Sequence, residues 1–475
     1  MTGTATTALT AAGTAAPATR SPEQRRTLVL ASASTLVVLI AFVTPLATVA
    51  RTAASLGSDP TTVPWLLSAM ALGLAVALLP SGALADDTGR RRVFVAGLVV
   101  LAAGSLLCAV APSSSAFVAG RLVSGLGGGA VLACGLGLLG AAFPPGPARA
   151  HATGVWGASV GGGIALGGLL VVALDQGAGW RRTYVVLALL AVALGVAGAR
   201  LLVESRADVR QPPDLAGAAL LGAGLAALLA GLVQAQSGAS GQVLALAAAG
   251  VLLLVAFAAV EARRTSPMLD LALLRRRPFL AATVGAFTSW LGVTALAAFT
   301  PTLVQRGLGR SLLAAALVTL LFAGTSVVTA LLLRRLPLRW TSRALLVGGL
   351  LAVAAGQLAQ TGLDPGSSLL RLVPGLLVTG VAFGVLNATV GREAVASVPP
   401  DRTAMGSGAN NTARYVGSAL GICLVVVVAT RSPEQGAAGL VAGWDDAAQL
   451  TAALSVLGAL VVAALRPARP GPARS

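Results

Sequence analysis

The stretch that decides the fold reads GALADDTGRRR at residues 82–92, and it separates two long apolar runs. Gly82 has no side chain, which allows membrane helices to pack closely. Asp86 complements the positive end of a helix that begins just after it, and Gly89 permits a tight turn. The stretch therefore predicts a short cytoplasmic turn between two membrane-spanning helices. Its key residues are Gly82, Asp86, Gly89, Arg90 and Arg91.

The composition around this stretch is that of a membrane protein. The chain has 475 residues, 56% hydrophobic and 10% charged, with a mean hydropathy of +0.87. Soluble domains carry about 25% charged residues, so a soluble enzyme and a disordered chain are both excluded. All 33 basic residues are arginines and the net charge is +17. They lie in short clusters between apolar runs, which excludes a nucleic-acid-binding surface and indicates cytoplasmic loops.

Fourteen segments are apolar and long enough to cross a bilayer, which takes about 20 helical residues. We therefore expect an all-α integral membrane protein. The expected spans are 28–50, 62–84, 93–112, 116–142, 153–174, 183–203, 214–235, 241–260, 279–304, 312–333, 343–362, 369–391, 405–430 and 446–465.

The positions of the arginines orient these spans. With the N-terminus inside, 24 arginines fall in inner segments and 7 in outer segments. Because positive residues concentrate on the cytoplasmic side, both termini are predicted to be cytoplasmic. The expected location is the inner (plasma) membrane of the cell, which the chain crosses many times.

Short repeats indicate two related halves. RLVSGL at 121–126 recurs as RLVPGL at 371–376, and IALG at 164–167 recurs as SALG at 418–421. Parallel repeats of this kind are typical of transporters. The expected organisation is a cytoplasmic tail (1–27), a six-helix half (28–208), an inserted two-helix hairpin (209–260), a cytoplasmic linker (261–278), a second six-helix half (279–466) and a cytoplasmic tail (467–475).

The stretch at 82–92 closely resembles the signature between the second and third spans of the major facilitator superfamily. The resemblance implies two six-helix halves, and with the hairpin 14 transmembrane helices, with this stretch as an inner-side conformational switch. Arg121, Gly125 and Gly127 are similar to the superfamily's fourth-span motif. The fifth span holds glycines that look like the antiporter motif of the superfamily: Gly157, Gly161, Gly163, Gly167 and Gly168.

Other segments resemble the fourteen-span drug:proton antiporters, the multidrug efflux branch. They include Asp214 with Gly217, and Glu261 with Arg264. The chain also departs from that pattern. The first span of the branch usually carries an Asp and then an Asn, whereas residues 41–46 read AFVTPL. Buried carboxylates are the usual proton relay, and all 16 acidic residues fall in loops, tails or span ends. The resemblance therefore implies proton coupling, whereas the lack of an acidic residue in the middle of any predicted span argues in part against it.

Two arginines fall inside predicted spans. Arg121 lies in the fourth span and Arg414 in the thirteenth. A charge at that depth costs about 3 kcal/mol or more, so it normally faces a cavity or a partner. Each arginine therefore either contacts substrate in the pathway or extends along the helix to reach the interface.

Uncharged polar residues at membrane depth form a second candidate set. Polar side chains in spans either join helices through hydrogen bonds or line a pathway, and both readings stay open here. Together with Arg121 and Arg414, the candidates for the substrate and proton pathway are Trp290, Gln305, Asn387, Asn410 and Asn411.

These observations favour a secondary active transporter, which is not an enzyme and exports drug-like or natural-product molecules in exchange for protons. The alternative is a facilitator or an anion exporter that holds an acidic solute without proton exchange. The three cysteines lie in apolar runs without metal-ligand spacing and there is one histidine, so no metal or cofactor is expected. The expected partners are a small-molecule substrate, protons and the lipid bilayer, with no nucleic acid, and the chain is expected to be a monomer.

Overall fold

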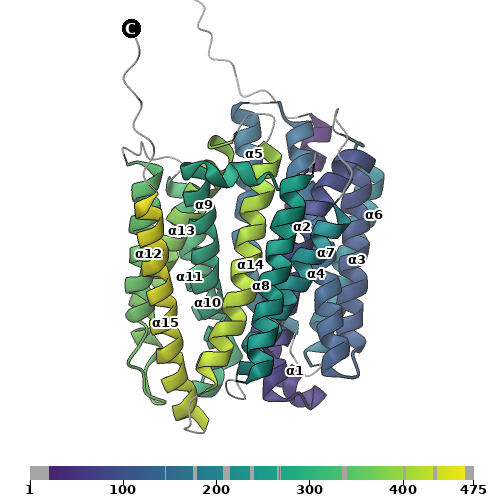
Figure 1. The fold of residues 1–475 in the computed structure, drawn as a ribbon. Helices are drawn as coiled ribbons and strands as arrows, with labels where there is room; N and C mark the ends of the chain where they lie inside the picture. Colours follow the sequence, from purple (N-terminus) through teal and green to yellow (C-terminus); the bar gives the residue numbers. More distant parts are fainter. Residues whose placement is uncertain are drawn as a thin grey trace, which may run out of the picture.

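We describe the chain from a computed structural model that covers residues 21–144, 146–174, 179–206, 214–235, 240–264, 267, 269–333, 340–398, 403–431 and 436–465. The predicted tail at 467–475, and residues 1–20 of the predicted tail at 1–27, lie outside these ranges. Within them every regular element is a helix, and the long helices run side by side in one bundle (Figure 1).

The long helices are α1 (Pro22–Leu56), α2 (Val63–Thr88), α3 (Arg90–Val110), α4 (Ser114–Ala142), α5 (Pro147–Leu174), α6 (Arg181–Leu201), α7 (Leu215–Gln234), α8 (Gly241–Arg263), α9 (Arg277–Ser289), α10 (Ala295–Thr302), α11 (Leu312–Leu333), α12 (Ser342–Leu358), α13 (Val373–Ala396), α14 (Thr403–Ala429) and α15 (Gly436–Ala464). The short ones are η1 (Pro60–Thr62), η3 (Leu271–Arg275), η4 (Trp290–Thr294), η5 (Leu303–Gly307) and η6 (Leu369–Arg371).

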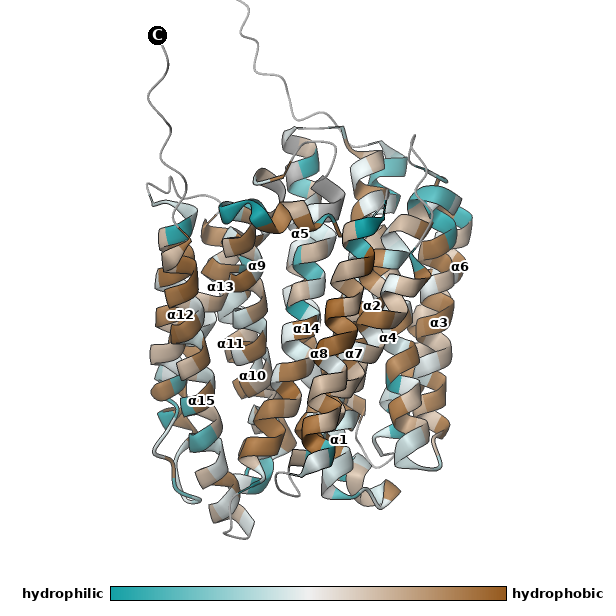
Figure 2. Ribbon diagram, viewed as in Figure 1, coloured by the Kyte–Doolittle hydropathy of each residue, from teal (hydrophilic) through white to brown (hydrophobic). Residues whose placement is uncertain are grey.

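The bundle has the dimensions and surface of a membrane protein. Thirteen helices in the described ranges are long and apolar enough to cross a membrane, and α12 is apolar but has only 17 residues. Hydrophobic residues cover the sides of the bundle and hydrophilic ones gather toward its two ends (Figure 2). The predicted all-α membrane fold is confirmed, whereas the number of fourteen spans stays a prediction.

The helices form two groups. Helices α1 to α6 pack mainly against one another, and α9 to α15 do the same. Helices α7 and α8 pack together as a hairpin, and α7 contacts both α2 and α14. The two groups meet chiefly along two contacts, α2 with α14 and α5 with α11, and α1 also touches α10.

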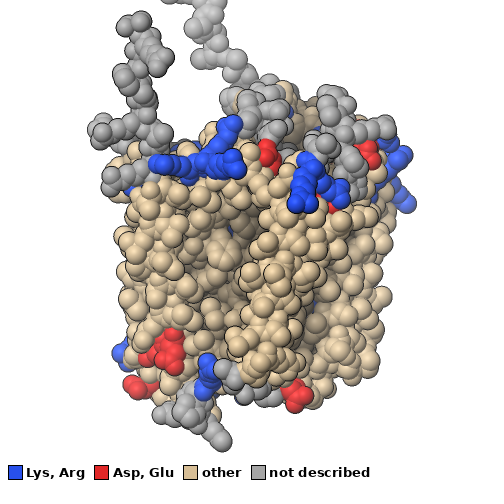
Figure 3. Space-filling view, in the orientation of Figure 1, with Lys and Arg blue, Asp and Glu red and all other residues tan. Residues whose placement is uncertain are grey.

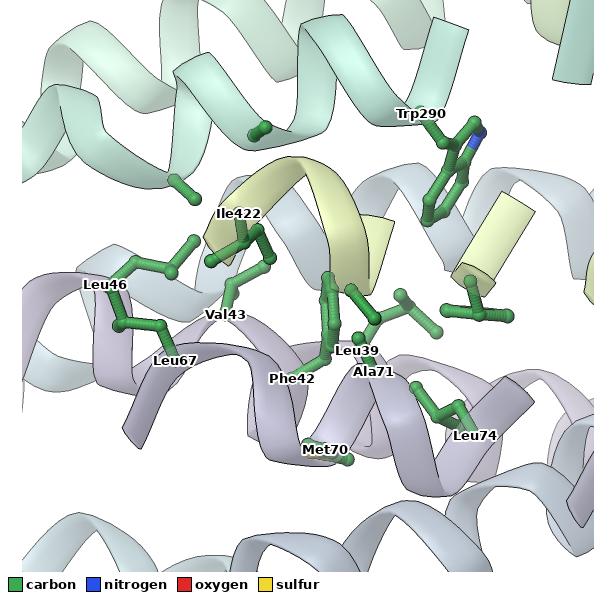
Figure 4. Packing of buried hydrophobic residues seen from close by; sticks show 14 of the residues in the cluster. Leu39, Phe42, Val43, Leu46, Leu67, Met70, Ala71, Leu74, Trp290 and Ile422 are labelled. Atoms are coloured by element: carbon green, nitrogen blue, oxygen red, sulfur yellow. The ribbon is translucent and has the colours of Figure 1, made fainter. Parts of the chain in front are cut away.

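The apolar core crosses this junction between the groups. Figure 4 shows Phe42 and Val43 of α1 beside the α14 residue Ile422, with Leu67, Met70 and Leu74 of α2 on the neighbouring helix. All of these side chains are buried. Apolar contact therefore continues from one group of helices to the other.

Several helices extend beyond the expected spans, and the starts of α1 and α15 show why. α1 begins at Pro22 because Ser21 forms a capping box with Gln24: the Ser21 Oγ accepts from the Gln24 backbone N–H at 3.2 Å. α15 begins at Gly436, ten residues before the expected 446, and contains Asp445 and Asp446. Hydropathy detects only the part of a helix inside the hydrocarbon layer, whereas a helix continues beyond it where charged residues are solvated.

The predicted span at 279–304 is interrupted. Residues 277–307 form α9, the π-turn η4, α10 and the π-turn η5 in succession. π-turns widen a helix locally and are frequent at functional sites. Trp290 opens the first of them and is 2% exposed.

Charged residues mark the two ends of the bundle (Figure 3). In that view, blue arginine side chains gather at the upper end. Acidic side chains predominate at the lower end, and the wall between the ends is almost free of charge on this face. The distribution agrees with the arginine asymmetry of the sequence.

Candidate functional site

The stretch at 82–92 forms a compact charged turn where α2 ends and α3 begins. The Asp86 carboxylate accepts two hydrogen bonds from the Arg90 guanidinium, from Nε at 3.0 Å and from Nη2 at 2.8 Å. Arg90 also reaches α4, where its Nη1 donates to the Gly137 carbonyl at 3.5 Å. The ion pair therefore joins α2 to α3 and lies against α4.

Asp86 binds the side chain of Arg90, the first residue of α3, and its predicted effect on the start of that helix stays a prediction. Glu204, just after α6, binds the backbone there: its Oε1 accepts from the Arg91 N–H at 2.9 Å. Its Oε2 lies 3.7 Å from the guanidinium nitrogens of both Arg91 and Arg92. Sequence reasoning missed Glu204. The available signal was an acid directly after a predicted span, in a segment rich in arginine.

The two glycines of the turn have different roles. Gly89 has φ +126°, a conformation that L side chains rarely adopt, and an added Cβ would lie 2.6 Å from Glu204 Oε1. The tight turn predicted there is confirmed. The expected close packing at Gly82 is wrong, because nothing lies within 4 Å of the position that its Cβ would take.

The glycines of α5 bring this helix close to its neighbours on two sides. An added Cβ at Gly163 would lie 2.6 Å from Leu39 Cβ, and one at Gly167 would collide with Val43, both on α1. On the α11 side, Gly161 faces Val327 and Gly168 faces Ala316. Gly157 lies on the same helix and is partly buried. The α5 glycines thus form part of the contact between the two groups of helices.

Arg121 is buried against the backbone of α1. It is 1% exposed; its Nη1 donates to the Ala41 carbonyl at 2.6 Å and its Nη2 to the Phe42 carbonyl at 3.0 Å. Pro45 lies inside α1 and has no backbone N–H, so it cannot supply the helical hydrogen bond to the carbonyl of residue 41. Arg121 provides the missing donor. The guanidinium therefore does not extend to the interface, and its predicted role in the pathway stays a prediction.

Trp290, Asn387 and Arg414 come together inside the second group of helices. The Trp290 indole Nε1 donates to the Asn387 Oδ1 at 3.4 Å. The Arg414 guanidinium carbon lies 5.9 Å from the centre of the Trp290 ring. Figure 4 shows Trp290 projecting from its helix toward the buried cluster around Phe42. The structure therefore joins three of the predicted pathway residues, one each from η4, α13 and α14.

Aromatic rings surround this trio. Tyr415 packs edge-on against Trp290, at 5.2 Å between centroids, and against Phe42 of α1, at 6.0 Å. Phe383 lies 6.1 Å from Trp290 and 5.8 Å from Phe322. The Tyr415–Phe42 contact links the trio to the first group of helices.

Of the other predicted pathway residues, two form hydrogen bonds to backbone carbonyls rather than to this trio. Gln305 donates to the Pro301 carbonyl of its own span at 3.2 Å. Asn410 is buried and donates to the Ala282 carbonyl of α9 at 3.5 Å, which joins two helices. Asn411 follows it on α14 and is partly buried. For Asn410, this bond supports the reading that polar side chains join helices, which the sequence left open.

A small apolar hollow lies between the two groups where α1, α5, α10 and α11 meet. Its walls are almost entirely apolar, so it offers contact area rather than polar recognition. It is lined by Val43, Leu46, Ala47, Ile164, Gly168, Pro301, Ala315, Ala316 and Thr319.

No group of three or more His, Cys, Asp or Glu side chains in the described ranges is arranged to hold a metal ion. The three cysteines, Cys108, Cys134 and Cys423, are buried and free. They contribute small apolar volume to the core.

Comparison with known proteins agrees with this architecture. The sequence profile of the Major Facilitator Superfamily matches residues 36–422. The chain is 32% identical to a protein of Streptomyces coelicolor that is described as an actinorhodin transporter, over 78% of this chain and 66% of that protein. It is 33% identical to the puromycin resistance protein of Streptomyces alboniger, over 87% of this chain and 84% of that one.

A solved structure shows the same fold. The crystal structure of the human organic anion transporter MFSD10 aligns with a TM-score of 0.64 at 20% sequence identity, covering 93% of this chain and 100% of that one. The profile match spans most of the chain and includes the charged turn, the α5 glycines and most of the helices around Trp290. The chain therefore belongs to the major facilitator superfamily of membrane transporters.

Proposed function

We propose that this protein is a secondary active transporter that exports drug-like or natural-product small molecules by alternating access, and that it catalyses no chemical reaction. The observation that carries the proposal is the division of the bundle into two groups of helices that meet along α2–α14 and α5–α11. Rocking of two such halves around a central site is the usual mechanism of transporters built from repeats. The names of the two relatives, one a transporter and the other a resistance protein, support export as the direction.

The charged turn serves as the inner-side switch in this proposal. It is held by two ion-paired acids, Asp86 and Glu204, at the end of the bundle where the arginines gather. Ion pairs at the membrane surface are weak one by one, so such a network can break and re-form as the halves move. We place the protein in the plasma membrane as a monomer, with both termini in the cytoplasm.

Exchange for protons follows from the resemblance to the drug:proton antiporters. One observation favours the alternative of anion export without proton exchange. Arg121 and Arg414 both lie at membrane depth, and neither has a carboxylate within salt-bridge distance among the residues that the structure covers.

The experiment that tests the proposal measures efflux of a panel of anionic, neutral and cationic compounds from cells that express the protein, with and without a proton uncoupler. We expect expression to lower the accumulation of some compounds in the panel, and the uncoupler to abolish this effect. Unchanged accumulation of every compound contradicts export. Export that persists in purified proteoliposomes without a pH gradient contradicts proton exchange and supports the alternative.

A further inference from the structure

We infer that the Arg414 guanidinium, with the Trp290 ring and the Asn387 amide beside it, is the binding site for a negatively charged group on the transported molecule. The inference rests on the proposed function and names its substrate class: amphipathic aromatic acids, such as carboxylates and phenolates.

The first support is the depth of Arg414. It lies eleven residues after Thr403, where α14 begins, which is about 16 Å along the helix at 1.5 Å per residue. The bilayer core is about 30 Å thick, so Arg414 lies well inside the membrane. A charged arginine at that depth is energetically unfavourable unless a partner or a cavity compensates its charge.

The second support is that the structure gives Arg414 no anionic partner. In the described part of the chain it has no salt bridge, and its buried Nε has no hydrogen-bond partner. Glu393, which lies on α13 close to the Gly391 that Arg414 approaches, is not within salt-bridge distance of it. The guanidinium is instead held by the Trp290 ring, and Tyr415 is its titratable neighbour.

Arg121 shows the contrast. It also lies within a membrane-spanning helix, but two of its nitrogens donate to the carbonyls of Ala41 and Phe42, and the side chain is 1% exposed. Arg414 is partly exposed and has no such bonds to the backbone. Of these two arginines, the structure therefore leaves Arg414 with donors for an arriving ligand.

The third support is the composition of the surroundings. Four aromatic rings form a row, with 5.2 to 6.1 Å between the centroids of neighbouring rings, in the order Tyr415, Trp290, Phe383, Phe322. All four rings are buried and form an aromatic wall beside the guanidinium, and a guanidinium near a ring keeps its N–H edge for a carboxylate or phenolate oxygen. The Asn387 amide adds a neutral polar group that accepts from the indole. The bundle face drawn in Figure 3 is hollowed near its centre, where Figure 1 places α9, α10 and α14.

Two dyes with the same xanthene ring system and opposite charge test the inference: fluorescein, an anion, and rhodamine 123, a cation. Export of each is measured in proteoliposomes of the full-length protein. We expect the parent protein to export fluorescein in preference to rhodamine 123. Arg414→Gln should lower fluorescein export and binding about tenfold or more, the loss expected for one charged hydrogen bond, and change rhodamine 123 export much less. Arg414→Lys should restore part of the loss, because the charge returns without the planar fork.

Arg392→Gln is the matched control, because Arg392 is an exposed arginine at the arginine-rich end of α13. It should export both dyes at the parent rate. Binding of fluorescein to each purified variant, followed by fluorescence anisotropy, separates loss of the site from loss of transport, and thermal unfolding shows whether Arg414→Gln is folded.

The outcomes separate the inference from the proposed function. Folded Arg414→Gln protein that binds and exports fluorescein like the parent overturns the inference, as does an equal loss of both dyes. A parent protein that exports rhodamine 123 but not fluorescein also overturns the inference and leaves the proposed efflux in place. A parent protein that exports neither dye nor any compound of the panel overturns the proposed function itself.

Discussion

At the scale of single residues, the pairing of Arg121 with the backbone of α1 yields a prediction about stability. Pro45 deprives the Ala41 carbonyl of its helical donor, and Arg121 replaces it. We expect Arg121→Ala to lower the free energy of unfolding by about 1–3 kcal/mol, the cost of a buried acceptor left without a donor. Thermal unfolding of the purified protein measures the loss.

A double-mutant cycle isolates the interaction. Pro45→Ala returns a backbone N–H to α1, so Arg121→Ala should cost less in that background than in the parent. Arg200→Ala, at an exposed position near the end of α6, is the control and should change stability by no more than about 0.5 kcal/mol. Equal losses from Arg121→Ala in both backgrounds would show that Pro45 and Arg121 do not act together.

At the scale of helices, two adjacent glycines of α5 should respond differently to the same change. A methyl group at Gly163 would lie 2.6 Å from Leu39 Cβ and 2.7 Å from the Leu36 carbonyl oxygen, whereas at Gly162 the nearest atom is 3.8 Å away. Gly163→Ala should therefore force α1 and α5 apart and destabilise the protein by about 1–3 kcal/mol. Gly162→Ala should be neutral or slightly stabilising, because Ala favours the helix.

Melting temperatures of the two purified variants, together with their export rates, check this prediction. The pair controls for helix propensity, since both substitutions are Gly to Ala in the middle of one helix. Similar melting temperatures for the two variants would mean that the close approach of α1 to α5 does not depend on Gly163.

At the scale of the whole molecule, the concentration of arginines at one end predicts the orientation in the membrane. We expect both termini to be cytoplasmic. A C-terminal green fluorescent protein should fluoresce, and alkaline phosphatase fused at the same point should be inactive, since each folds on only one side of the membrane. A fusion within 59–62, before α2, is the control and should give active phosphatase. An active phosphatase at the C-terminus would contradict the orientation or the number of spans.

The sequence predicted the helical membrane fold because hydropathy and arginine position are properties of single segments. It could not predict contacts that need the fold. Asp86 was expected to complement α3, and Glu204, which was not expected there, binds the backbone at the start of this helix because α6 returns its end to the same surface. Arg121 was identified as a charge that is unfavourable inside the membrane. Its partner is the backbone of α1, and a pattern of side chains in the sequence does not reveal a backbone partner. Trp290 and Arg414 were both identified, and only the packing of η4 against α14 brings them together.

The contact between Arg121 and α1 also bears on how the chain is made. α1 leaves the ribosome before α4, and an arginine within a membrane span opposes insertion of that span by the translocon. When α4 arrives, the Ala41 carbonyl is already in the bilayer and lacks a donor. We therefore expect entry of α4 to be favoured while α1 is still adjacent at the exit of the translocon. In that case the proline and the arginine couple the folding of the first half to the order of its synthesis.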